Sequence, residues 1–131
     1  ANSKCLSADV NAAFDPNYPS VSEANNSAYI SCGAGITKFT GARGKSASND
    51  ADAEFIGWLR RIFDENGVIW QTGEMGKVDE GGGGTVAKYI ASKNIDTIDI
   101  GVPVISMHSP YELISKADLY EVYLAFRAFI K

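Results

Sequence analysis

A single side chain in this sequence can serve both as a nitrogen ligand for a metal and as a general acid or base near neutral pH. It is His108, the one histidine among 131 residues. Residues 95–105 precede it and form an apolar run rich in β-branched side chains, which predicts a buried strand. Gly101 and Pro103 predict an interruption, because both weaken the strand's hydrogen-bond ladder. His108 is therefore expected at the carboxyl end of a strand, where open α/β sheets bind ligands.

The residues around His108 leave two interpretations open. Ser109 and Glu112 have capping-box spacing with Pro110 at a first helical position, so a helix or helical turn is expected to begin there. A lone histidine needs carboxylates to make a metal site, and the candidate is Asp9, far away in the sequence. Each could instead be structural: His108 satisfied by backbone groups, and Asp9 a turn or helix-cap residue.

Composition limits the fold and the partners. At 131 residues with 45% hydrophobic content, the chain is one domain's worth and can bury a core. Twelve basic against sixteen acidic residues argue against nucleic-acid partners, which need a basic stripe. No apolar run approaches the roughly 20 residues that cross a bilayer, so a soluble, cytoplasmic protein without membrane contact is expected. Cys5 and Cys32 lack zinc-motif spacing and are expected as buried thiols.

Hydrophobic periodicity predicts a mixture of strands and helices. A short strand is expected around Cys5 and Leu6, and the Asn- and Pro-rich residues 11–26 predict a long loop directly after Asp9. The other expected strands are residues 28–40, 68–71 and 95–105, and the expected helices are residues 48–66, a short one near 86–91, and 116–131.

Two further stretches could contact a ligand. Residues 81–84 are four glycines leading into Thr85, and glycine lets backbone amides approach a ligand closely, although a slack turn before a helix has the same composition. Lys38 could hold an anionic group if it points into a site, or it is an ordinary surface charge. A basic turn at residues 41–45 lacks the full spacing of a phosphate loop.

Five short motifs follow one another along the chain. They are Ser7-Ala8-Asp9, Asp15-Pro16-Asn17-Tyr18, Gly35-Ile36-Thr37-Lys38, Gly82-Gly83-Gly84-Thr85, and Met107-His108-Ser109 with Glu112. In this order and spacing they resemble the aspartyl aminopeptidase and aminopeptidase I family. Its members are dinuclear metallo-aminopeptidases that release amino-terminal residues from peptides. The resemblance covers nearly the whole chain.

The resemblance implies a three-layer α/β/α peptidase fold, with residues 1–131 as the carboxyl-terminal portion of its catalytic domain. Asp9 would bind one of two metals and His108 the other, the metal being zinc or alternatively cobalt or manganese. The family also uses an earlier histidine, a bridging aspartate and a pair of glutamates, one of them the general base, and none has a match here. The chain alone is therefore expected to be inactive without the missing amino-terminal part of the same protein.

The resemblance also implies roles in substrate binding and assembly. Lys38 stands where acid-selective members contact the substrate side chain, and the residues that would line the peptide cleft are Gly83, Gly84 and Thr85. Glu112 would be a helix cap or would fix the tautomer of His108. Ala12 and Asp15 stand where aspartyl members carry histidines, so a narrow acidic specificity is not implied. Family members often form dodecamers, which implies a homo-oligomer.

Two other classes of function remain as alternatives. The first is a non-catalytic anion- or nucleotide-binding module that uses residues 81–84 with Lys45 or Lys77 as the counter-charge. No proper phosphate-loop motif supports it. The second is an assembly domain with an exposed strand edge that pairs with other chains.

Overall fold

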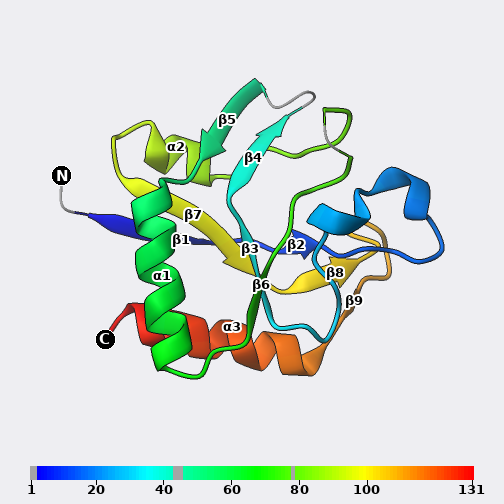
Figure 1. Ribbon diagram of the computed structural model, residues 1–131. Helices are drawn as coiled ribbons and strands as arrows, with labels where there is room; N and C mark the ends of the chain where they lie inside the picture. Colours follow the sequence, from blue (N-terminus) through cyan, green and yellow to red (C-terminus); the bar gives the residue numbers. More distant parts are fainter. Residues whose placement is uncertain (1–2, 43–45, 78) are drawn as a thin grey trace.

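A mixed four-stranded sheet lies at the centre of the computed structural model, which describes residues 3–42, 46–77 and 79–131 (Figure 1). The strand order is β1 (Lys4–Ala8), β7 (Asp96–Gly101), β3 (Ala34–Thr37) and β6 (Trp70–Thr72). β7 pairs in parallel with β1 and antiparallel with β3, and β3 pairs in parallel with β6. Residues 43–45, most of the predicted basic turn, lie outside the described ranges.

The β1–β7 pair continues into a second, smaller sheet. β2 (Asn11–Ala12) runs parallel to β8 (Pro103–Ile105), and β9 (Leu113–Ile114) pairs antiparallel with β8. The predicted interruption of the 95–105 strand is confirmed, because Val102 separates β7 from β8. A third sheet is the antiparallel pair β4 (Phe39–Ala42) and β5 (Ser46–Asp50).

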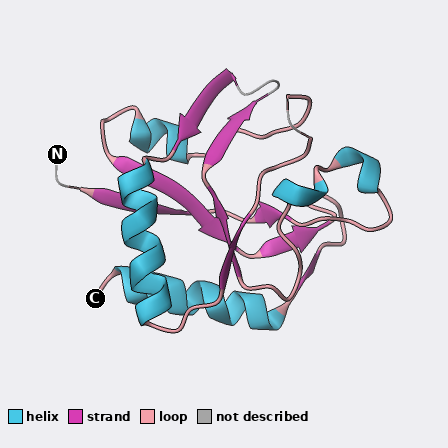
Figure 2. Ribbon diagram, in the orientation of Figure 1, coloured by secondary structure: helices cyan, strands magenta, loops and turns pink. Residues whose placement is uncertain are grey.

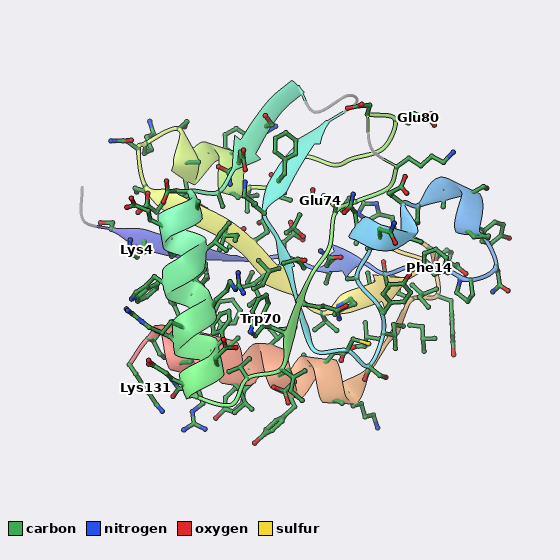
Figure 3. All side chains as sticks on the ribbon, in the orientation of Figure 1. Lys4, Phe14, Trp70, Glu74, Glu80 and Lys131 are labelled. Carbon is green, nitrogen blue, oxygen red and sulfur yellow. The ribbon has the colours of Figure 1, made fainter. Side chains whose placement is uncertain are left out.

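Two long helices cover one face of the central sheet. α1 (Ala53–Glu65) and α3 (Lys116–Phe129) bury their apolar sides against β3 and β7. At the far end of both helices, Lys131 donates a hydrogen bond to Asn66 Oδ1 at 3.2 Å (Figure 3). The fully buried members of this core include Ala34, Phe55, Leu59, Phe63, Ile98, Ile100 and Ala125.

The opposite face of the sheet is covered by shorter elements. Side chains alternate along a strand, so Thr97 and Asp99 point away from the face that carries Ile98 and Ile100. Here lie the five-residue α2 (Ala87–Ala91) and the β4–β5 pair. The 3-10 turns η1 (Pro19–Val21) and η2 (Ala24–Asn26) occupy the long predicted loop, on the side away from α1 (Figure 2). This arrangement agrees with the predicted α/β/α layering.

The first long helix starts later than its sequence pattern suggests. Residues 48–50 pair with β4 as part of β5, and α1 begins only at Ala53. Asp52 sets this start, because its side chain accepts hydrogen bonds from the backbone N–H groups of Glu54 and Phe55, as an N-cap does. Gly67 lies just beyond the helix end with a φ of 67°, a conformation that glycine adopts readily at this position.

The helix predicted to begin at Pro110 is wrong. Residues 109–111 form a bend, and Leu113 and Ile114 pair with β8 as β9. The α3 helix begins at Lys116 instead, where Ser115 Oγ accepts a hydrogen bond from the Asp118 N–H. The Ser109 side chain bonds the backbone of Tyr111, so this hydroxyl stabilises a turn in place of a helix start.

The two cysteines differ in their exposure to solvent. Cys5 is half-buried, but Cys32 is exposed, so the expectation of two buried thiols is wrong for Cys32. None of the helices in the described ranges is both long and apolar enough to cross a membrane.

Candidate active site

Asp9 follows β1 at the point where the central sheet passes into the smaller one. Its backbone N–H donates to Ile100 O at 3.3 Å, and its carboxylate Oδ1 accepts from the Val10 N–H at 2.9 Å. The side chain is partly exposed and borders a hollow of about 280 Å³ between the strand ends and α3. Asp9 thus follows the first expected strand, and it lies at the carboxyl end of the parallel β1–β7 pair.

Gly101 allows Asp9 this position. A Cβ atom placed on Gly101 would lie 1.7 Å from the carbonyl oxygen of Asp9, far inside any contact distance. The absence of a side chain therefore lets the Asp9 backbone pack directly against the end of β7.

His108 lies in a tight turn three residues beyond the end of β8. Ser106 and His108 both have positive φ values, 60° and 65°, which side chains other than glycine rarely adopt. The Ser109 N–H donates to Ser106 O at 3.1 Å, closing the turn. The imidazole is exposed, so it is available to groups outside the described chain.

Glu112 holds this turn through the backbone. Its Oε1 accepts a hydrogen bond from the His108 N–H at 2.5 Å. The expectation that Glu112 caps a helix is wrong, because no helix begins there, and the recorded contact is with the main chain and not with the ring. Glu112 therefore orients the segment that carries the imidazole, whereas a role in selecting the tautomer has no contact to support it.

The two predicted metal ligands follow strands of two different parallel pairs, and within the described residues no hydrogen bond or ion pair joins them. Asp9 is level with Gly101, whereas His108 lies in the turn beyond β8, in which Val104 is the register partner of Ala12. Carboxylate oxygen and imidazole nitrogen are both donors that zinc accepts. Among the described residues, however, no group of three or more His, Cys, Asp or Glu side chains is arranged to hold a metal. The donor types fit zinc, but this chain supplies too few of them to form a site.

Lys38 is engaged by a neighbouring carboxylate. Its Nζ forms an ion pair with Asp50 Oδ1, and both side chains are about half exposed, at 44% and 56%. Screening by solvent makes such a pair weak, so an incoming anion can compete with Asp50 for the ammonium group.

The glycine turn at residues 81–84 packs against β4. The Gly41 N–H donates to Gly83 O at 3.0 Å, and Gly82 has a φ of 129° with its missing Cβ directed at Gly41 O. Thr85 ends the turn and donates from Oγ1 to Asp99 Oδ2 at 2.6 Å. The turn predicted from sequence is thus tied to the central strand β7 through a buried side chain.

Asp99 is a buried carboxylate that the sequence analysis missed. It is 3% exposed, and burial raises the pKa of its carboxyl, which the Ser7 and Thr85 hydroxyls lower and the Asp9 carboxylate raises. Ser7 is its register partner on β1, yet neither Ser7 Oγ nor Asp99 Oδ1 makes a well-formed hydrogen bond in the described structure. Thr85 is therefore the hydrogen-bonded partner of Asp99, and Ser7 is a close neighbour whose rotatable hydroxyl can turn toward the carboxylate.

A signal for Asp99 was present in the sequence. The residue stands between Ile98 and Ile100 in a run otherwise expected to be buried, and a buried aspartate needs partners. Asn11 carried no comparable signal. It is 1% exposed and donates from Nδ2 to Thr37 Oγ1 and to Gly73 O, contacts that only the folded chain reveals.

A cavity of about 460 Å³ opens between the loop after β2 and the His108 turn. Its walls are mostly apolar, and of the described residues that line it only Asp15 is charged. The apolar side chains that line it include Ala12, Tyr18, Val21, Val104 and Met107.

Comparison with known proteins identifies close relatives. The model of the family described as aminopeptidase I zinc metalloprotease (M18) matches residues 1–130. The probable M18 family aminopeptidase 1 of Clostridium acetobutylicum is 54% identical over 129 residues, which cover 98% of this chain and 28% of the relative. The protein of the same name from Thermotoga maritima is 47% identical over 130 residues, which cover 99% of this chain and 29% of that relative.

Solved structures agree with these sequence relatives. The crystal structure of aminopeptidase I from Clostridium acetobutylicum has a TM-score of 0.94 at 53% identity and covers 99% of this chain and 28% of that chain. An M18 aminopeptidase structure from Thermotoga maritima has a TM-score of 0.91 at 48% identity, covering 96% and 28%. The chain therefore spans a little over a quarter of its relatives' length. Because the family model matches almost every residue, the chain belongs to the aminopeptidase I zinc metalloprotease (M18) family.

Proposed function

We propose that the complete protein to which this chain belongs is a metal-dependent aminopeptidase that removes amino-terminal residues from peptides. The observation that carries the proposal is the family match over residues 1–130. The nucleotide-binding alternative gains no support from the comparisons, and α2, with five residues, is too short to offer a helix-end anion site. Residues 1–131 would form the carboxyl-terminal portion of the catalytic domain.

Asp9 and His108 are our candidates for metal ligands. Both follow parallel strands, both are at least partly exposed, and they offer donor types that suit zinc, the metal in the family's description. A second metal, and cobalt or manganese as substitutes, belong to the same proposal. Zinc in such a site polarises the scissile carbonyl and activates water. The general base and the remaining ligands would come from the rest of the protein.

The substrate would lie between the glycine turn and the His108 turn. Gly83, Gly84 and Thr85 would line the peptide backbone. Lys38 would meet an acidic side chain only by releasing Asp50, whereas the cavity beside the His108 turn has mostly apolar walls. We therefore expect a neutral, apolar first residue to be preferred over an acidic one, with kcat/KM for leucyl and aspartyl substrates as the measurement.

We also propose that the complete protein assembles into a homo-oligomer. Several large apolar side chains are exposed on α3 and on either side of it, including Tyr111 before it at 84% and Ile130 after it at 77%. These would be covered by the rest of the protein or by further copies in a homo-oligomer. A structural neighbour only 19% identical, PhTET1-12s, is titled a dodecamer, a statement about that protein that makes the same assembly worth testing here. We expect the assembly to be cytoplasmic.

Substitution of the candidate ligands in the complete protein tests this function. Asp9→Ala and His108→Ala should each lower the bound zinc and reduce peptide hydrolysis on the order of a hundredfold or more, because each removes a direct ligand. Glu54→Gln removes an exposed carboxylate on α1 and should change neither measurement. Full activity with unchanged zinc content in both ligand variants would refute the assignment.

A further inference from the structure

A row of polar side chains crosses the central sheet beneath the glycine turn. Asp99 on β7 is the register partner of Ser7 on β1 and of Thr37 on β3. All three are buried, with exposures of 3%, 6% and 4%. A buried carboxylate with one well-formed hydrogen bond is costly to maintain, so this row calls for an explanation beyond the packing of a core.

On one side, Asp99 is hydrogen-bonded to the residue that ends the glycine turn. The Thr85 hydroxyl donates to Asp99 at 2.6 Å, a charge-assisted bond in a site where Thr85 is itself only 9% exposed. Ala87, two residues later, is fully buried. Glycine-rich backbone has little stiffness of its own, so the Thr85 bond fixes the height of residues 82–84 above the sheet.

On its other side, Asp99 is close to the segment that carries Asp9. Ser7 stands opposite Asp99 and precedes Asp9 by two residues, and Gly101 follows Asp99 by two residues and contacts the Asp9 backbone. Asp99 therefore lies between the candidate substrate turn and the candidate metal ligand. Its one hydrogen-bonded partner, Thr85, belongs to the glycine turn.

We propose that Asp99 is a positioning residue for the aminopeptidase reaction. Through Thr85 it holds the glycine turn at a fixed distance from the strand end that carries Asp9, and so it sets where the substrate backbone binds relative to the metal. This inference rests on the proposed function. It assigns Asp99 no contact with substrate or metal.

The test separates substrate binding from chemistry in the complete protein. Thr85→Val and Asp99→Ala each remove the bond, and each should raise KM on the order of tenfold while kcat falls less, because the cost falls on placing the substrate. Thr85→Ser and Asp99→Asn keep a hydroxyl donor and an oxygen acceptor and should restore KM. Binding of a dipeptide whose peptide bond is reduced to CH₂–NH, measured by calorimetry, should weaken in parallel with KM.

A double variant gives a second readout. If both residues act through one bond, Thr85→Val combined with Asp99→Ala should be no worse than the worse single variant, whereas independent roles would multiply. Multiplying effects, or a wild-type KM in Thr85→Val, would overturn the inference, and Thr85→Val keeps the test open should Asp99→Ala not fold. If Asp9→Ala abolishes activity while Thr85→Val behaves as wild type, the positioning role falls and the proposed function stands. Undiminished activity in Asp9→Ala would instead remove the function on which the role rests.

Discussion

The buried carboxylate of Asp99 also alters the chemistry of a neighbouring thiol. Cys5 lies on the same strand as Ser7, two residues before it. Burial raises the pKa of the Cys5 thiol, and the negative charge of Asp99 raises it further. Since the thiolate is the reactive form, Cys5 should react slowly with alkylating agents at a pH where an ordinary thiol reacts readily.

Alkylation kinetics test this electrostatic link. In a Cys32→Ser background, Asp99→Asn should lower the pKa of Cys5 and so increase its rate of labelling by iodoacetamide at pH 8, by roughly a few fold. Burial remains, so the rate should stay below that of a free thiol. Glu65→Gln, an exposed change at the end of α1, is the control and should leave the rate unaltered. Equal rates in the Asp99 variant and the parent would show that Asp99 carries no charge felt by Cys5.

The sequence identified individual residues when their chemistry and their position agreed. Asp9 and His108 each combine a ligand type with a place after an expected strand, and the structure puts both there. Glu112 has the right neighbours for a cap, but its actual partner is a main-chain N–H inside a turn. Such partners depend on backbone angles, here two positive φ values, that the residue types around His108 do not encode.

At the scale of elements, one carboxylate of α3 is hydrogen-bonded to the loop that leads into β3. Asp118, in the first turn of the helix and 1% exposed, accepts hydrogen bonds from the backbone N–H groups of Ser31 at 2.7 Å and Gly33 at 2.9 Å. Both residues have positive φ values, 67° and 98°, and they lead directly into β3. The bonds therefore hold an otherwise unfavourable loop conformation against the helix.

Removal of this fastening should destabilise the fold strongly. Asp118→Ala leaves the buried Gly33 N–H and the part-buried Ser31 N–H without their acceptor and should lower the free energy of unfolding by about 2 kcal/mol, measured as a shift of the urea midpoint in the complete protein. Asp118→Asn retains one acceptor and should lose less. Lys116→Ala, an exposed change on the same helix, should be nearly neutral. A neutral Asp118→Ala would mean that the loop holds its conformation unaided.

Elements with strong periodicity were predictable, and those set by distant pairing were not. The α3 helix starts where its apolar pattern and Ser115 indicate, and the break between β7 and β8 follows from Gly101 and Pro103. Residues 48–50 and 113–114 became strands because β4 and β8 offered them partners. No local propensity of those residues shows that such partners exist.

At the scale of the whole molecule, the chain corresponds to one part of the fold of its relatives. It spans about 28% of its relatives' length, and within the described residues no metal-binding cluster is complete. The exposed apolar side chains on α3 are consistent with surfaces that the rest of the protein covers.

The isolated 131-residue chain should therefore lack activity. We expect it to hydrolyse no aminoacyl substrate and to bind zinc weakly, because two candidate ligands that do not touch cannot hold two metals. Turnover assays and zinc titration on the purified chain, with the complete protein as the positive control, provide the measurement. Turnover by the chain that a chelator abolishes would contradict this expectation.

The close approach of Asp9 to Gly101 has an evolutionary consequence. Every missense change of a glycine codon adds at least a methyl group, and at this position that group would lie 1.7 Å from a backbone oxygen. Any single substitution of Gly101 is therefore expected to be deleterious unless the Asp9 segment shifts to make room for the new side chain. At Gly57, on α1 and away from the candidate site, an added methyl would meet no heavy atom within 4 Å, so lineages of this protein are free to diverge there.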